Sequence, residues 1–309
     1  MSPKQLARLA MVLGALLLLW GAASLARRGS SGPSESDRFA LAAVPRDSVD
    51  SIIIQRVADT ARLARVDSAT WTVNGHRASR SAVQDILAAL ADTARRSELA
   101  GSRPASHAGF GVDSTKGTRI RLVSGDSTIA DLVQGHRGPG LEGGYFRFSR
   151  DSAVYMVGGN LAQVLEQTSD ELRDKKIARV NPDSVARIEV TRGRRSYALR
   201  RDEKTWALTP GGHADSAAVA ELLSSYREVE AAGFATPAQA DSAQFGRPDR
   251  RLAVLRADGS PLLSLVFDST ATGFWARAAG DSTVYRLDTW SVDRLVPSDS
   301  TLKAKPRTS

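Results

Sequence analysis

The first hydrophobic feature of the chain is residues 9–26, which begin with Leu9, end with Ala26 and contain no charged side chain. As a helix rising about 1.5 Å per residue, this stretch reaches roughly 27 Å, close to the hydrocarbon thickness of a bilayer. The pattern predicts a transmembrane helix. Ser24 and Ala26 also form a small-x-small site, so a cleaved signal peptide is the alternative, but the length of the apolar stretch favours an anchor.

Positive charges flank this stretch on both sides, with Lys4 and Arg8 before it and Arg27 and Arg28 after it. The charge balance and the short leading tail both favour an inward amino terminus. We therefore expect a cytoplasmic tail at residues 1–8, a transmembrane signal anchor at 9–26 and a flexible linker at 27–40. This arrangement predicts a single-pass protein of the bacterial inner membrane whose C-terminal domain is extracytoplasmic, that is, periplasmic.

Beyond the linker, the same hydrophobic pattern occurs twice. Residues 47–56 and 183–192 share the start Asp-Ser-Val and read as strands. Further matches follow in the same order at nearly the same spacing: Trp71 with Trp206, Phe110-Gly111 with Phe245-Gly246, Tyr145-Phe146 with Phe274-Trp275, and Val154-Tyr155 with Val284-Tyr285. The chain therefore predicts two tandem repeat units.

Each unit contains one strong helical stripe with apolar residues at i, i+3, i+4 and i+7. The two stripes are Val83, Ile86, Leu87 and Leu90, and Val219, Leu222, Leu223 and Tyr226. Ser79 and Asp215 stand just before them and can accept hydrogen bonds from first-turn amides. We expect one amphipathic helix per unit, resting on a core.

Short segments rich in β-branched and apolar residues lie between these landmarks, at 118–123, 128–134, 252–256 and 262–267. They are bounded by Gly125-Asp126 and Asp258-Gly259, which favour hairpin turns. Each unit reads β-β-β-α-β-β-β-β, with a closing helical turn near 161–165 or 290–295. We predict an α+β fold with antiparallel sheets, a first unit at 41–180, a second at 181–297 and a polar C-terminal tail at 298–309.

These features resemble the bacterial domain of unknown function 4340 family. The resemblance rests on the paired Trp-plus-helix units, on Phe110-Gly111, on residues 135–147, and on residues 172–177 leading into Pro182. It implies one amino-terminal membrane segment and a neighbourhood of ABC-type transporter and gliding-motility-like auxiliary components. It brings no family active site.

Composition narrows the chemistry further. The chain has 309 residues and no cysteine, which excludes disulfides, thiolate catalysis and cysteine-ligated metal sites. The net charge of +8 suits an anionic partner or a membrane surface. Acidic residues are scattered among the basic ones through most of the chain, so the charge does not demand such a partner.

No motif indicates catalysis, and we expect no catalytic, cofactor-binding or metal-binding residues. Residues 138–143 match G-x-G-x-x-G, but a strand is expected to follow them, whereas a nucleotide fingerprint needs a helix amino terminus there. His76 and His213 occupy similar turns before the two helices, which favours local roles over a shared metal. Residues 300–303 fit S-x-x-K without its companion motifs.

One basic cluster is a candidate patch for an anionic partner: Arg192, Arg194, Arg195, Arg200 and Arg201. Alternation puts Ile188, Val190, Tyr197 and Leu199 inward, so most of these arginines should line a solvated edge, and edge protection is the simpler interpretation. Trp71 and Trp206 hold matching strand positions, which favours core packing over ligand stacking.

The sequence favours a non-catalytic, membrane-anchored extracytoplasmic accessory or adaptor protein. We expect it to associate with an ABC-type transport or gliding-motility-like complex, with permease or auxiliary subunits as partners and no nucleic acid. The alternative is a soluble or anchored envelope protein that binds an anionic ligand, or an envelope enzyme, with a site between the two units.

Overall fold

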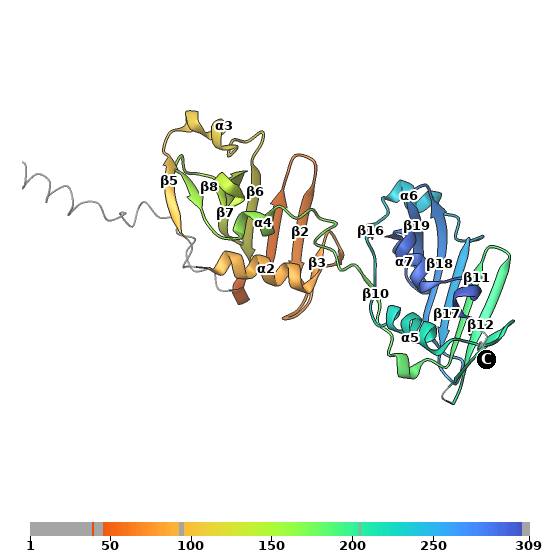
Figure 1. The fold of residues 1–309 in the computed structure, drawn as a ribbon. Helices are drawn as coiled ribbons and strands as arrows, with labels where there is room; N and C mark the ends of the chain where they lie inside the picture. The colour runs from red at the N-terminus through yellow and green to blue at the C-terminus, as the bar shows by residue number, and fades with distance from the viewer. Residues whose placement is uncertain (1–38, 40–45, 93–95, 204, 305–309) are drawn as a thin grey trace, which may run out of the picture. The chain divides into compact units, whose positions relative to one another are not determined.

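The computed structural model describes residues 39, 46–92, 96–203 and 205–304. It divides into two compact units, Met1–Ser169 and Asp170–Ser309 (Figure 1). Among the described residues, none of the helices combines the length and hydropathy of a membrane span. The predicted transmembrane helix at 9–26 and the predicted linker at 27–40 lie outside the described residues, apart from Phe39.

The first unit is built on one antiparallel sheet. Its strands are β1 (Ser51–Gln55), β2 (Thr60–Arg65), β3 (Trp71–Val73), β4 (His76–Arg77), β5 (Ser97–Gly101), β6 (Thr118–Ser124), β7 (Ser127–Arg137), β8 (Gly144–Phe148) and β9 (Val154–Val157). They are ordered β4-β3-β2-β1-β6-β7-β8-β9-β5, so the central pair is β1 and β6. The chain meanders outward through β1 to β4, crosses to the opposite edge at β5, and then meanders outward again through β6 to β9.

The helices of the first unit are short apart from the crossover helix. They are α2 (Arg80–Ala91), α3 (His107–Phe110) and α4 (Leu161–Leu165), with 3-10 turns η2 (Arg46–Ser48), η3 (Pro104–Ser106) and η4 (Pro139–Leu141). Ser79 is the N-cap of α2 and accepts a hydrogen bond from the amide of Ala82. Val83, Ile86 and Leu90 are buried, as the helical stripe predicts. α2 and α4 pack against each other.

The second unit repeats this strand order in its own nine-stranded sheet. Its strands are β11 (Arg187–Arg192), β12 (Arg195–Asp202), β13 (Thr205–Thr209), β14 (Gly212–His213), β16 (Gly233–Phe234), β17 (Arg250–Leu255), β18 (Pro261–Thr270), β19 (Gly273–Ala278) and β20 (Tyr285–Leu287). The order is β14-β13-β12-β11-β17-β18-β19-β20-β16, again antiparallel throughout. A separate two-stranded antiparallel sheet pairs β10 (Lys176–Ala178) with β15 (Val229–Glu230).

Helices cover one face of this second sheet. They include α5 (Ser216–Ser225), α7 (Thr289–Leu295) and α8 (Asp299–Leu302), while α6 (Pro237–Ser242) precedes β17 and the 3-10 turn η5 (Pro182–Ser184) precedes β11. Asp215 caps α5 by accepting hydrogen bonds from Ala217 and Ala218 at 2.9 Å. The core joins the helical residues Val219, Leu222 and Val292 to the inward residues of the sheet.

The predicted α+β class with antiparallel sheets is confirmed, as are the helical turns at α4 and α7 and the hairpin turns between β6 and β7 and between β17 and β18. The structure adds the edge strands β4, β5, β14 and β16 and the short helices α3 and α6. Hydrophobic alternation does not mark these edge strands. β4, β5 and β14 are mostly exposed, and β16 is buried but has only two residues.

Both predicted boundaries of the second unit need correction. The division falls between Ser169 and Asp170, not after residue 180, because β10 pairs with β15 of the second unit and Val180 lies in its core. Residues 298–304 are not a free polar tail. Leu302 is buried in the same core, and Lys303 forms a β-bridge with Ala214. Burial of Leu302 and this bridge together fix the segment to the domain.

Candidate functional site

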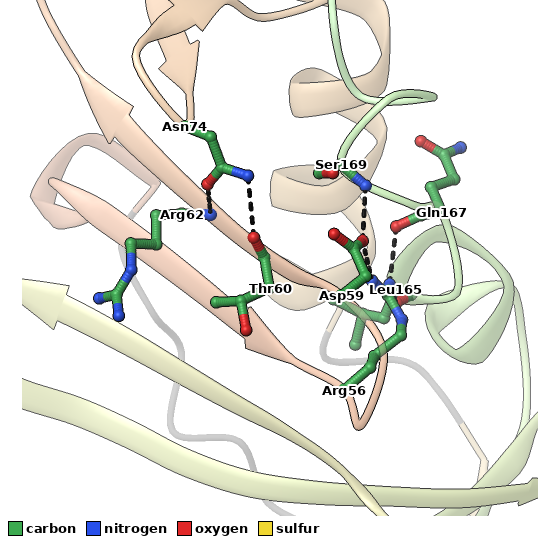
Figure 2. Close-up of polar contacts among 8 residues, drawn as sticks. All are labelled: Arg56, Asp59, Thr60, Arg62, Asn74, Leu165, Gln167 and Ser169. Carbon is green, nitrogen blue, oxygen red and sulfur yellow. Dashed lines mark hydrogen bonds and ion pairs between the residues drawn. The ribbon is translucent and has the colours of Figure 1, made fainter. Parts of the chain in front are cut away.

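A polar clamp closes one end of the first unit (Figure 2). Arg56 follows β1, and its guanidinium donates to the carbonyl oxygens of Leu165 at 2.5 Å and Gln167 at 2.6 Å. The same side chain pairs with Asp59 at 3.2 Å, and Asp59 accepts from the amide of Ser169 at 2.8 Å. All of these partners are internal, and three are main-chain groups. The clamp therefore fixes the segment after α4 to the β1–β2 hairpin, which is a structural role.

The structure does not gather the five predicted arginines at one surface. Arg192 pairs with Asp293 at 3.1 Å, and Arg201 donates to the carbonyl oxygen of Pro182 at 2.8 Å. Arg194 and Arg195 lie exposed at the β11–β12 turn, and Arg200 is exposed further along β12. Two of the five are thus engaged internally. Binding of an anionic partner by the remainder stays a prediction.

The glycine-rich stretch, the two histidines and the two tryptophans that the sequence analysis considered lie in ordinary elements of the fold. Residues 138–143 link β7 to strand β8, so no helix amino terminus follows the glycines and the hairpin interpretation is confirmed. His76 and His213 lie in the exposed strands β4 and β14 rather than in turns. Trp71 and Trp206 are buried, as predicted. Within the described ranges, no three His, Asp or Glu side chains converge on a possible metal position.

A row of three side chains crosses the second sheet on the face opposite its helices, which we call the open face. Arg251 on β17 lies opposite Val266 on β18, and Val266 lies opposite Arg277 on β19. Directly paired residues of an antiparallel sheet point to the same side. Their chain neighbours Leu252, Leu265 and Ala276 are buried in the core. The two arginines therefore flank one valine on the open face.

This row borders a pocket of about 540 Å³ on the open face. Small residues, Ala253 and Ser264 among them, line it beside Val266. Phe245, from the segment between α6 and β17, forms a wall that is 9% exposed, and the guanidinium of Arg277 lies 4.5 Å from its ring centroid. The amide of Gln244 donates to Asp268 on β18 at 2.9 Å, which fixes this wall to the sheet.

The acidic side chains that line the pocket have partners within the protein, whereas its two arginines do not among the described residues. Glu189 pairs with Arg187 at 2.6 Å, and Asp281 accepts from the Tyr285 hydroxyl at 2.7 Å. Burial, together with the hydrogen bond to Asp281, raises the pKa of Tyr285 to about 12. Within the described part of the chain, the guanidinium N–H groups of Arg251 and Arg277 have no hydrogen-bond or ion-pair partner.

A second hollow, of about 390 Å³, lies on the helical side of the same unit, beside the start of α7. Trp290 lines it and is 67% exposed, the one aromatic among the large exposed hydrophobic side chains of the described residues. The guanidinium of Arg294, one turn along α7, lies 4.7 Å from its ring centroid. Arg227 and Glu230 also line this hollow, which makes its rim polar.

The comparisons bear on the family alone. A family model described as "Domain of unknown function (DUF4340)" matches residues 71–248, more than half of the chain. The chain belongs to this family. The DUF4340 match runs from β3, at Trp71, into the segment that carries Phe245, so Arg251, Arg277 and Trp290 lie beyond it. No curated protein and no solved structure matches the chain significantly.

Sequence reasoning missed the pocket and the exposed tryptophan. The signal for the pocket is present in the strand patterns, because alternation already turns Arg251, Val266 and Arg277 away from the core. What the pattern lacks is the register that makes them neighbours. No comparable sequence signal marks Trp290. α7 is short and buries residues on one side only, so its pattern does not show whether the tryptophan is exposed.

Proposed function

We propose that this DUF4340 protein is a non-catalytic, membrane-anchored accessory protein whose extracytoplasmic domain binds a protein partner of an ABC-type transport or gliding-motility-like membrane complex. Residues 9–26 supply the anchor in this proposal, with residues 1–8 in the cytoplasm and the domain on the periplasmic side. A tether of this kind raises the local concentration of the domain beside a membrane partner, so a modest surface is enough for stable association.

The observation that carries the proposal is Trp290 beside its hollow. A tryptophan with 67% of its surface exposed leaves a large apolar area in water, which burial by a partner would recover at about 25 cal/mol per Å². Tryptophan and arginine are the residues most enriched at binding hot spots, and here Arg294 stacks on Trp290. The hollow next to the indole can receive a side chain of the partner.

We propose further that the chain is a tandem duplication, with one α+β unit on each side of residue 170. The two nine-stranded sheets share one strand order, and each unit has a capped helix at the same place in that order. Only the second unit has a tryptophan as the second residue of its closing helix, since the residue at that place in α4 is Ala162, which is buried. Partner binding would then belong to the second unit alone.

The experiment is photo-crosslinking of the tagged full-length protein in native membranes. A photoreactive residue replaces Trp290 in one sample and Val66, exposed in the first unit, in the other. We expect crosslinks from position 290 to a permease or auxiliary subunit, identified by mass spectrometry, and none from position 66. Trp290→Ala in the tagged protein should reduce recovery of that subunit about tenfold or more.

A second form with residues 1–26 replaced by a cleavable signal tests the tether. The proposal predicts that the crosslinks from position 290 weaken strongly when the domain is released. Equal crosslinking and full function of the released form would remove the anchor from the mechanism. Equal crosslinking from positions 290 and 66 would show that Trp290 is not the contact site for the partner.

A further inference from the structure

We propose that the open-face pocket of the second unit binds an oxyanion, a carboxylate or a phosphate group, between Arg251 and Arg277. The apolar part of the same small molecule would lie against Phe245. This site is separate from Trp290 and from the proposed membrane partner, because it lies on the other face of the sheet and uses other residues.

The first unit carries the same Arg-Val-Arg row, which makes it an internal comparison. There Arg119 on β6 lies opposite Val133 on β7, and Val133 lies opposite Arg147 on β8. The strands are the equivalents of β17, β18 and β19 in the shared sheet order. The row is therefore an element of both sheets, and the two units differ in what satisfies its charges.

In the first unit both guanidinium groups are satisfied internally. Arg119 makes a bidentate contact with Asp131, at 2.9 and 2.5 Å. Arg147 donates to the carbonyl oxygens of Val112 at 2.8 Å and Ser149 at 2.9 Å. The arginine pair of the first unit thus already makes charge-assisted hydrogen bonds within the unit, which is a structural role.

In the second unit neither arginine has a hydrogen-bond acceptor among the described residues. The place of Asp131, two residues before the valine, is taken by Ser264, which is too short and uncharged to pair with Arg251. Among the described residues, the Arg277 guanidinium has the stacking contact with Phe245 and no hydrogen-bond or ion-pair partner. Stacking on an aromatic ring leaves the N–H edge of a guanidinium free to donate, so both arginines of the described pocket offer unused donors.

The loop that covers the open face differs between the two units. This difference explains why the open face is filled in the first unit and has a pocket in the second. In the first unit, Val112 packs against Val133 in a small apolar cluster, and Gly135 has no room for a side chain beside the carbonyl oxygen of Phe110. In the second unit, the exposed Arg247 stands two residues after Phe245, where the first unit has Val112. Asp268 stands two residues after Val266, where the first unit has Gly135. Its carboxylate holds the backbone of Gln244, so the loop stands over a pocket.

The dimensions suit a small ligand. Arg251 and Arg277 are two strands apart, so their backbones are separated by roughly 10 Å and two long side chains can converge on one group. A volume of about 540 Å³ is in the range of small-molecule sites. Guanidinium groups bind planar carboxylates and phosphate oxygens through paired N–H donors, and Phe245 and Val266 provide an apolar contact for the rest of the molecule.

The test is calorimetric titration of the detergent-solubilised full-length protein with phenyl phosphate, benzoate and inorganic phosphate. We expect at least one ring-bearing oxyanion to bind saturably, more weakly as salt increases. Arg251→Gln and Arg277→Gln should each weaken binding about tenfold or more, since each removes charge-assisted hydrogen bonds. The ratio of phenyl phosphate to benzoate affinity tells phosphate from carboxylate ligands, and Phe245→Ala should weaken both but not inorganic phosphate.

Matched variants separate a binding role from a structural one. Ser264→Asp places in the second unit the acid that neutralises Arg119 in the first, and it should abolish binding without removing either arginine. Ser264→Asn, which has the size of the aspartate but no charge, should weaken binding much less than Ser264→Asp, and Arg119→Gln in the first unit should bind like the wild type. Unchanged affinity in both arginine variants, loss in Ser264→Asn as great as in Ser264→Asp, or no saturable binding of any probe to the wild type at millimolar concentration, would each overturn the proposal.

Discussion

The guanidinium of Arg147 donates to the carbonyl oxygen of Val112 at 2.8 Å and so fastens the loop after α3 to the open face of the first sheet. Arg277, at the corresponding place in the second sheet, holds no carbonyl group of its loop. We expect Arg147→Gln to destabilise the covering loop by about 1–3 kcal/mol, because charge-assisted hydrogen bonds to the main chain are lost.

Hydrogen exchange of the amides in residues 107–117 measures this effect. Exchange there should speed up in Arg147→Gln. Arg277→Gln should loosen the loop around Phe245 much less, because it removes only a stacking contact and Asp268 still fastens that loop. Equal loosening of both loops would show that the two arginines have the same structural role.

Arg119 and Asp131 make stability depend on pH. The hydrogen bond from Arg119 lowers the pKa of Asp131 below its ordinary value of 3.8, with burial opposing the shift. A carboxyl whose folded pKa is depressed contributes stability that is fully present above the unfolded value and is lost as pH falls through the folded value. Asp131→Asn should therefore melt below the wild type at neutral pH, with the difference vanishing at strongly acidic pH.

Thermal unfolding measured by circular dichroism across this pH range checks the expectation. Asp126→Asn is the control, because Asp126 lies in the turn of the same hairpin and its side chain has no hydrogen-bond or ion-pair partner in the described part of the chain. A melting-temperature difference between wild type and Asp131→Asn that persists at acidic pH would contradict the ion-pair explanation.

The Arg56 clamp depends on the forked shape of a guanidinium (Figure 2). Lysine keeps the charge but cannot hold Leu165, Gln167 and Asp59 together, so Arg56→Lys should destabilise the first unit by about 1–3 kcal/mol. Arg62→Lys is the matched control, because the Arg62 guanidinium has no hydrogen-bond or ion-pair partner among the described residues. Denaturant unfolding followed by hydrogen exchange in residues 161–169 measures the effect, and equal losses in the two variants would contradict the clamp.

The hydroxyl of Tyr226 is fully buried and donates to the carbonyl oxygen of Leu295 at 2.7 Å, joining the end of α5 to the end of α7. Tyr226→Phe leaves that carbonyl without this donor and should cost about 1–3 kcal/mol of unfolding free energy. Tyr145→Phe should cost little, because the Tyr145 hydroxyl has no hydrogen-bond partner among the described residues. Urea unfolding of both variants measures the difference. An unchanged free energy of unfolding in Tyr226→Phe would contradict the prediction.

The sequence predicted the local structure well where local rules apply. Ser79 and Asp215 cap their helices, and Ile188, Val190, Tyr197 and Leu199 face the core, because capping and alternation depend only on neighbouring residues. The matching of the two halves was weaker in one strand. Tyr145 lies opposite Met156 and Trp275 opposite Arg286, so the counterpart of Tyr145 is Trp275 and not Phe274. A slip of one residue exchanges the two faces of a strand.

The candidate site could not be predicted because its residues come from separate strands. The arginine-rich segment around Gly193 was visible in the sequence, but Asp293, distant along the chain, neutralises Arg192. Neither Arg251 nor Arg277 belongs to that segment or to a motif that would mark it in the sequence. Their significance depends on being paired through Val266 and on the serine that stands where the first unit has an acid.

The apolar stretch at 9–26, the antiparallel α+β class, the helix caps, the hairpin turns and the side chains that point away from the core could all be predicted from the amino-acid sequence. Those properties follow from composition, from periods of two and 3.6 residues, and from the chemistry of adjacent residues. The pairing of β1 with β6 and of β11 with β17 is visible in the folded chain alone, and so is the set of outward side chains that become neighbours. Pairing between distant strands sets that register, so whether an arginine meets an aspartate or an open pocket is decided across the sheet rather than along the chain.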